Sequence, residues 1–225
     1  MKALAALLVT AMKRRRERPV RQVQSNMCYG LDRSIKMTIG ASNIMIYDGI
    51  VPPDLTAQLG SLARKPIWQY GWRSNVESDN YFFWHSHFAG GDTNSDTDSA
   101  HALANRQGLQ SVSALWEHIE TSIGAPQKLL RAYANGHTYG TEGYAHKDSK
   151  REDYLSAIYF AHDEWQQDWG GELLFYADSG EIIKSVAPLP GRIVVFPGCI
   201  LHRASSLSRI CPLLRVSFVF KSSPR

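Results

Sequence analysis

The chain has 225 residues, 44% of them hydrophobic and 20% charged, which is the composition of a globular protein able to bury a full core without disulfides. Its formal net charge of +4 comes from residues 1–40, which hold nine of the 25 lysines and arginines and only two acids. The remaining 185 residues carry 16 basic and 19 acidic side chains. This balance excludes a strongly basic fold and argues against a nucleic-acid partner.

The cysteines and the first residues indicate where the protein is found. Cys28, Cys199 and Cys211 are odd in number and none lies in a CxxC pair, which argues against disulfides and for a reducing, cytoplasmic location. No apolar run is long enough for a transmembrane segment, and most of the positive charge follows the first apolar run, unlike in a secretory signal. We expect a disordered basic tail over residues 1–37, with an organelle-targeting leader as the alternative, and a single domain over 38–225.

The first half of this domain is expected to contain helices. A short strand is expected at 44–47 and a helix at about 55–64, where leucines recur at helical spacing after two prolines. A second helical stretch is expected over 99–123, with a break at Gly108. The aromatic-rich residues 67–92, which include Trp84, predict a strand pair packed on the core, or alternatively a wall over a ligand pocket.

From residue 127 onward the apolar pattern changes to a period of two, which is typical of short strands separated by turns. Many short strands in succession favour a double sheet or barrel. The fold class is therefore α+β: a jelly roll, or double-stranded β-helix, with N-terminal helices packed on one sheet. The expected strands are 128–133, 143–148, 154–160, 172–176, 181–186, 192–196, 199–203 and 213–220.

Three side chains form a candidate metal site. His146 and Asp148 are two residues apart, so on an extended strand they point to the same side. His202 follows the apolar run 192–198, which predicts a buried strand that could bring a third ligand from a facing wall. Two histidines and one carboxylate that leave other coordination positions open are the arrangement of non-haem Fe(II) oxygenases.

The last strand carries a second informative pattern. In residues 214–220 the even positions are all apolar, so Arg215 and Ser217 share the other face, which is the interior of a barrel. A buried guanidinium needs an anionic partner. That partner is either an internal aspartate or glutamate, or a bound carboxylate held by the arginine and the serine hydroxyl.

With these residues in place, the sequence resembles the Fe(II)/2-oxoglutarate-dependent dioxygenase superfamily, and within it the prolyl 4-hydroxylase branch. The resemblance covers roughly residues 127–221. Two departures stand out: Arg215 follows His202 by 13 residues, a few more than usual, and Phe160 stands where hypoxia-sensing prolyl hydroxylases have a tyrosine. The motifs are Ala132-Tyr133-Ala134-Asn135-Gly136, His146-Lys147-Asp148, Ile158-Tyr159-Phe160, Asp163-Glu164-Trp165, Gly170-Gly171-Glu172-Leu173, Pro190-Gly191-Arg192-Ile193-Val194-Val195-Phe196, His202 and Arg215.

The resemblance implies His146, Asp148 and His202 as iron ligands, and Arg215 as the partner of the distal carboxylate of 2-oxoglutarate. Ser217 and the Tyr133 hydroxyl are implied as helpers. The implied cofactors are Fe(II), 2-oxoglutarate as cosubstrate and O2, with ascorbate as an optional addition. The implied reaction hydroxylates a C–H bond of a peptidyl proline, an amino acid or another small molecule and releases succinate and CO2.

Two other classes of protein remain open at this point. A zinc hydrolase could use the same two histidines and aspartate with a metal-bound water, without a carboxylate site at Arg215. A non-catalytic jelly-roll protein could bind a metal or ligand there without decarboxylating 2-oxoglutarate. His85 and His87 also have metal-ligand spacing, but no carboxylate accompanies them.

Overall fold

The computed structural model describes residues 40–74, 79–91, 95–141 and 143–225. The expected tail at 1–37 lies outside these residues, so the division of the chain at residue 38 stays a prediction. Within the described ranges, no helix has both the length and the apolar character that crossing a bilayer requires.

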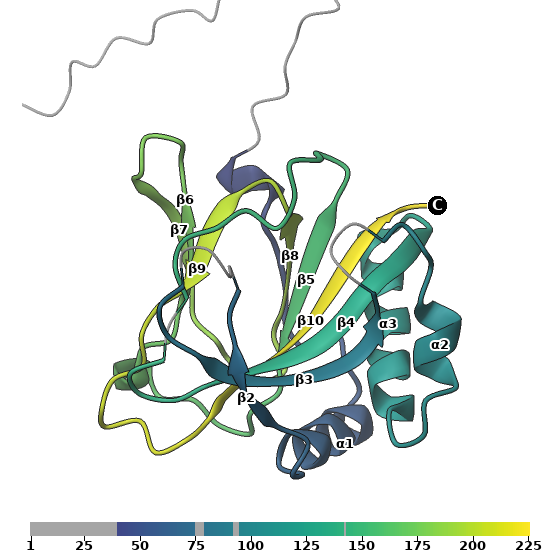
Figure 1. Ribbon diagram of the computed structural model, residues 1–225, viewed down its shortest axis with the longest axis horizontal. Helices are drawn as coiled ribbons and strands as arrows, with labels where there is room; N and C mark the ends of the chain where they lie inside the picture. The colour runs from purple at the N-terminus through teal and green to yellow at the C-terminus, as the bar shows by residue number, and fades with distance from the viewer. Residues whose placement is uncertain (1–39, 75–78, 92–94, 142) are drawn as a thin grey trace, which may run out of the picture. The chain divides into compact units, whose positions relative to one another are not determined.

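The strands of the described residues form two antiparallel sheets that face each other (Figure 1). The larger sheet has seven strands in the order β1-β8-β5-β10-β4-β3-β2, and the smaller has three in the order β7-β6-β9. The strands are β1 Met45–Tyr47, β2 Gln69–Trp72, β3 Phe83–Gly90, β4 Gln127–His137, β5 Leu155–Phe160, β6 Leu173–Tyr176, β7 Ile182–Val186, β8 Ile193–Pro197, β9 Leu201–Ala204 and β10 Arg215–Pro224.

Helices cover one face of the larger sheet (Figure 1). They are α1 Pro53–Ala63, α2 Ala100–Ala104 and α3 Gln110–Ile123, with the short 3-10 helices η1 Ala41–Asn43 and η2 Gln167–Trp169 elsewhere. The α2–α3 break predicted at Gly108 is confirmed, and this glycine has a positive φ of 83°. The apolar stripes of α1 and α3 pack against the outer face of β4, β5 and β10, where they form one of two hydrophobic cores.

The second core lies between the two sheets. It joins Phe160 of β5, Phe175 of β6, Phe196 of β8 and Val219 of β10 with other buried aliphatic side chains. Two facing antiparallel sheets with helices on the outside of one of them make the fold a double-stranded β-helix. The predicted fold class is confirmed.

One predicted strand is wrong. Residues 143–148 form no strand; among them only His146 makes a bridge, an isolated one to His202. The segment is held at two points, because the His146 amide donates to the His202 carbonyl and the Asp148 amide donates to the Gly198 carbonyl. Two separated contacts bring the two candidate ligands to β9 and to the turn before it, without the continuous ladder that defines a strand.

The alternation predicted for the last strand is confirmed. Arg215 and Ser217 of β10 face the space between the sheets and are 2% and 3% exposed. Phe218 and Phe220 point to the opposite side, into the core under the helices. The strand also runs further than predicted, to Pro224, since β4 continues to pair with it along its whole length.

Candidate metal and carboxylate site

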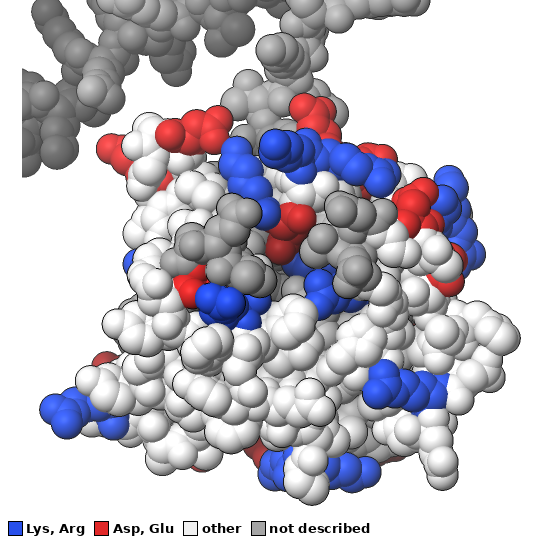
Figure 2. Space-filling model, viewed as in Figure 1, with Lys and Arg blue, Asp and Glu red and all other residues white. Residues whose placement is uncertain are grey.

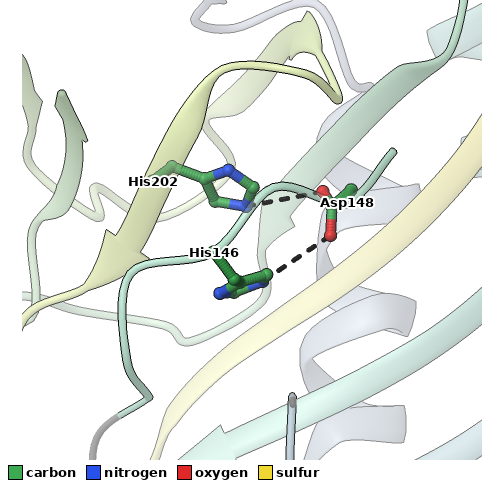
Figure 3. A group of neighbouring side chains, drawn as sticks. All are labelled: His146, Asp148 and His202. Atoms are coloured by element: carbon green, nitrogen blue, oxygen red, sulfur yellow. Dashed lines mark ion pairs between the residues drawn. The ribbon is translucent and has the colours of Figure 1, made fainter. Parts of the chain in front are cut away.

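His146, Asp148 and His202 converge at one point between the sheets (Figure 3). Their ligand atoms all lie within 4.8 Å of one another. The Nε2 atom of His146 is 3.6 Å from Oδ1 of Asp148, and the Nε2 atom of His202 is 3.4 Å from Oδ2. Two imidazole nitrogens and a carboxylate oxygen at these separations fit a single first-row divalent metal ion.

Hydrogen bonds orient both imidazoles toward this point. The Nδ1 atom of His146 lies 2.9 Å from the carbonyl oxygen of Tyr144, and the Nδ1 atom of His202 lies 2.9 Å from that of Ile200. A carbonyl only accepts, so each Nδ1 carries the proton and each Nε2 keeps a free lone pair for a metal.

Asp148 is held by two further side chains, Lys221 and Ser156. The Lys221 ammonium, buried on β10, donates to Oδ2 of Asp148 and lies 3.0 Å from the Ser156 hydroxyl. That hydroxyl donates to the same Oδ2 over 2.6 Å. Both donors therefore engage one carboxylate oxygen, which leaves Oδ1 as the freer donor for a metal.

The electrostatics of the group suit metal binding. Burial alone would raise the pKa of Asp148, but the positive charge of Lys221 acts in the opposite direction and the pKa lies well below its usual value, so the group is a carboxylate. Burial lowers the pKa of His202 to about 4, which keeps its imidazole neutral. A deprotonated carboxylate and a neutral imidazole are the states that coordinate metals.

Arg215 lines the same cavity and lies on the strand that also carries Lys221. Its Nε donates to the carbonyl of Gly171 over 2.6 Å, and its guanidinium lies 5.0 Å from the centre of the Phe160 ring. No carboxylate within the described residues forms an ion pair with it, and burial lowers its pKa to about 10, with Glu172 acting in the opposite direction. An internal acidic partner, one of the two alternatives for this arginine, is therefore not found in the described part of the chain.

Ser217 and Tyr133 line the same cavity as Arg215 and the three candidate ligands. The structure adds His137 and Asn135, which face the same cavity from β4. His137 lies directly opposite Arg215, and burial lowers its pKa to about 3, so it is neutral. The sequence held a signal for both residues, because 133, 135 and 137 alternate along one strand and must share a face.

No aromatic residue of the described part of the 67–92 stretch lines the cavity. Trp84 is paired with Gly136, on the side of β3 opposite His85, and packs against Tyr70. The His85 ring instead stacks on Trp72, and its centre lies 5.2 Å from that of Tyr133, a residue that lines the cavity. His85 and His87 are not part of the cluster of potential metal ligands found in the described residues.

Residues 130–220 match the family model described as the 2OG-Fe(II) oxygenase superfamily. The resemblance predicted from the sequence motifs is thereby confirmed, and it covers the strands that carry the cavity. No curated protein matches the chain.

Solved structures with the same fold include prolyl hydroxylases. A prolyl hydroxylase from Trichoplax adhaerens, in complex with a peptide fragment of the hypoxia inducible factor oxygen degradation domain, has a TM-score of 0.60 at 12% identity and covers 82% of this chain and 84% of its own. A 2OG-Fe(II) oxygenase family oxidoreductase from Burkholderia pseudomallei has a TM-score of 0.63 at 15% identity. The match covers 81% of this chain and 86% of the oxidoreductase. A Pseudomonas putida prolyl-4-hydroxylase has a TM-score of 0.54 at 16% identity, and the match covers 81% of this chain and 93% of the hydroxylase. At these identities the likeness shows the fold.

Proposed function

We propose that this protein is a non-haem Fe(II)- and 2-oxoglutarate-dependent dioxygenase that hydroxylates a C–H bond of its substrate. His146, Asp148 and His202 would hold the iron, and Arg215 with Ser217 would hold the distal carboxylate of 2-oxoglutarate. When bound, iron and 2-oxoglutarate supply the oxidising chemistry, with release of succinate and CO2.

The observation that carries this proposal is Arg215. Its guanidinium is 2% exposed and has no carboxylate partner in the described residues, so a bound anion would remove a large desolvation cost. It shares one cavity with the three candidate ligands. A dicarboxylate that reaches the metal with its other end fits both requirements, whereas a zinc hydrolase has no use for a carboxylate site there.

The remaining residues of the cavity have positioning roles. Ser217 is next to Arg215 on the same strand face and can donate its hydroxyl to the same carboxylate. The neutral His137, opposite Arg215, can donate a hydrogen bond without adding charge. Tyr133 stands between this end and the metal end, and burial raises its pKa, so it is a neutral donor for the cosubstrate.

The substrate is proposed at the level of a class. A peptidyl proline is supported by the fold shared with prolyl hydroxylases, one of which holds a peptide. A free amino acid or another small molecule fits the same chemistry.

The test is a titration of 2-oxoglutarate into the Fe(II)-loaded protein without oxygen, followed through the metal-to-ligand absorption band. The band should form in the wild type and be absent from His202→Ala, and adding O2 should yield succinate. Arg215→Ala should weaken 2-oxoglutarate binding by roughly two to four orders of magnitude, with Arg215→Lys in between because lysine keeps the charge but loses the planar fork.

Arg64→Ala is the matched control, since Arg64 is an exposed arginine paired with Asp163 on the surface. It should bind 2-oxoglutarate as the wild type does. Unchanged affinity in Arg215→Ala would remove the cosubstrate assignment and favour a zinc hydrolase.

A further inference from the structure

A second cation faces the cavity side of the larger sheet beside the three candidate ligands. Arg131 of β4 is the direct cross-strand partner of Lys221 of β10. The two lie on the same strand faces as Tyr133 and Ser217, which line the cavity. Lys221 lines the cavity near the metal end, and Arg131 lies next to it on the neighbouring strand.

These two cations differ in their partners. Lys221 is neutralised by Asp148, to which its ammonium donates. Arg131 is half-buried and forms no ion pair with any carboxylate in the described part of the chain. Its Nε atom is buried and lacks a hydrogen-bond partner among the same residues. With 2-oxoglutarate assigned to Arg215, Arg131 is left as a positive charge beside Lys221 without a matching carboxylate in the described part of the chain.

Aromatic rings fix the Arg131 guanidinium in place. It lies 4.8 Å from the ring centre of Tyr133 and 5.1 Å from that of Trp72. The His85 ring stacks on the Trp72 ring, with 4.0 Å between the two ring centres and 9° between the planes. A guanidinium held between flat rings keeps its edge available for a planar, bidentate acceptor, and it loses little freedom on binding.

The acidic group on this wall, Asp148, already has other partners. It is engaged by Lys221 and by the two histidines of the candidate metal site. His85 and His87 are the near titratable neighbours of Arg131 on β3, and Lys221 faces Arg131 from β10. Figure 2 shows acidic and basic side chains close together in the middle of the face that it draws.

From these contacts we infer that Arg131 binds a carboxylate of the substrate, with Tyr133 and Trp72 as its supporting platform. The substrate is therefore a carboxylic acid, either a free amino acid or a peptide that carries a carboxylate near the hydroxylated carbon. This inference rests on the proposed oxygenase function and makes its substrate class specific.

The test uses the protein loaded with Mn(II) and 2-oxoglutarate, which binds substrate without turnover. The probes are the twenty common free amino acids, N-acetylated tripeptides with a free C-terminal carboxylate, and the carboxamide counterpart of each. Melting temperature identifies ligands, and calorimetric titration measures their affinity. We expect at least one carboxylate to bind and its carboxamide to bind at least about 30-fold more weakly.

Three variants assign this discrimination to Arg131. Arg131→Gln should lose about 30-fold or more in affinity for the carboxylate and bind the carboxamide as the wild type does. Arg131→Lys should lie between them, and it keeps the test valid if the glutamine variant folds poorly. Arg209→Gln is the matched control, because Arg209 also lies over a ring, that of exposed Tyr139, with 5.9 Å to its centre.

Several outcomes would overturn the assignment. They are equal binding of carboxylate and carboxamide, full discrimination in both Arg131 variants, or no carboxylate of the panel binding the wild type. Failure of the proposed function would look different, because the anaerobic Fe(II)–2-oxoglutarate band would then be missing from the wild type. The substrate class alone would be refuted by a different pair of results. The Fe(II)–2-oxoglutarate band would be normal in the wild type, Arg131→Gln and Arg209→Gln, while the wild type would bind carboxylate and carboxamide equally well.

Discussion

Lys221 is the residue that most changes the environment of the three candidate ligands. It is buried and donates to Asp148, whose side chain is itself only 9% exposed. In the absence of a metal, the lysine provides the counter-charge that a buried carboxylate needs. A divalent metal ion bound to the same carboxylate would also neutralise its negative charge.

Lys221→Met should therefore destabilise the metal-free protein by about 3–5 kcal/mol, since it leaves Asp148 buried without its cationic partner. Saturating Mn(II) should raise the melting temperature of this variant more than that of the wild type, because the ion restores the missing charge. Thermal melts with and without Mn(II) measure both effects.

Lys147→Met provides the matched control for this lysine. Lys147 lies next to Asp148 in sequence but pairs with exposed Asp178, so its loss should change stability by less than about 1 kcal/mol. Equal Mn(II)-induced shifts in Lys221→Met and the wild type would show that Lys221 does not neutralise Asp148.

At the scale of elements, the turn between η2 and β6 determines where the Arg215 side chain lies. Gly171 has a φ of 77° in this turn, and its carbonyl accepts the hydrogen bond from Nε of Arg215. A Cβ added at Gly171 would lie 2.9 Å from Cδ of Arg215 and 3.2 Å from the Trp165 ring. The turn therefore packs directly on the stem of the arginine.

Gly171→Ala should weaken 2-oxoglutarate binding by about tenfold or more, because a displaced Arg215 cannot keep its fork aligned with a carboxylate. It should also cost about 1 kcal/mol or more of stability, since alanine is strained at positive φ. Titration of 2-oxoglutarate into the Fe(II)-loaded variant, together with a urea melt, measures the two effects.

The control is Gly180→Ala, in the β6–β7 turn. Gly180 has a φ of 88°, but a Cβ there meets nothing within 4 Å. This variant should show the loss of stability without the loss of affinity. If both alanine variants bound 2-oxoglutarate equally well, the turn would have no role in placing Arg215.

At the scale of the whole molecule, buried neutral histidines make the stability depend on pH. Burial lowers the pKa of His162 to about 4, and its ring packs on Trp165 while Nε2 contacts the carbonyl of Pro188 over 2.6 Å. In the unfolded chain His162 becomes protonated near pH 6.5, whereas in the folded protein it stays neutral down to about pH 4. The contribution of neutral His162 to the free energy of unfolding is fully present above pH 6.5 and is lost as the pH falls toward 4.

His162→Gln should therefore make the free energy of unfolding less sensitive to acid, by about 1.4 kcal/mol per pH unit between roughly pH 6.5 and 4. Urea denaturation at pH 7, 6 and 5 measures this slope. His101→Gln, which replaces an exposed histidine of α2, should leave the slope as it is in the wild type. An unchanged slope in His162→Gln would mean that this imidazole takes up its proton at the same pH in the folded and the unfolded protein.

The sequence alone determined the features that depend on local spacing. The alternation around Arg215 and Ser217 placed both on the inner face of β10, because successive side chains of a strand must point to opposite sides. Local periodicity also predicted the double sheet, and a glycine inside a helical stretch predicted the break at Gly108. His146, Asp148 and His202 do lie together, but the strand expected to carry the first two is not formed.

Tertiary structure decided the features that depend on which strands become neighbours. The contact of Lys221 with Asp148, and the stack of Arg131 on Trp72, join residues 73 and 59 positions apart. Their meeting requires the register in which Lys221 faces Arg131 across β10 and β4. Strand register depends on the burial of whole faces and on turn geometry summed over the sheet, so no local pattern in the sequence specifies it.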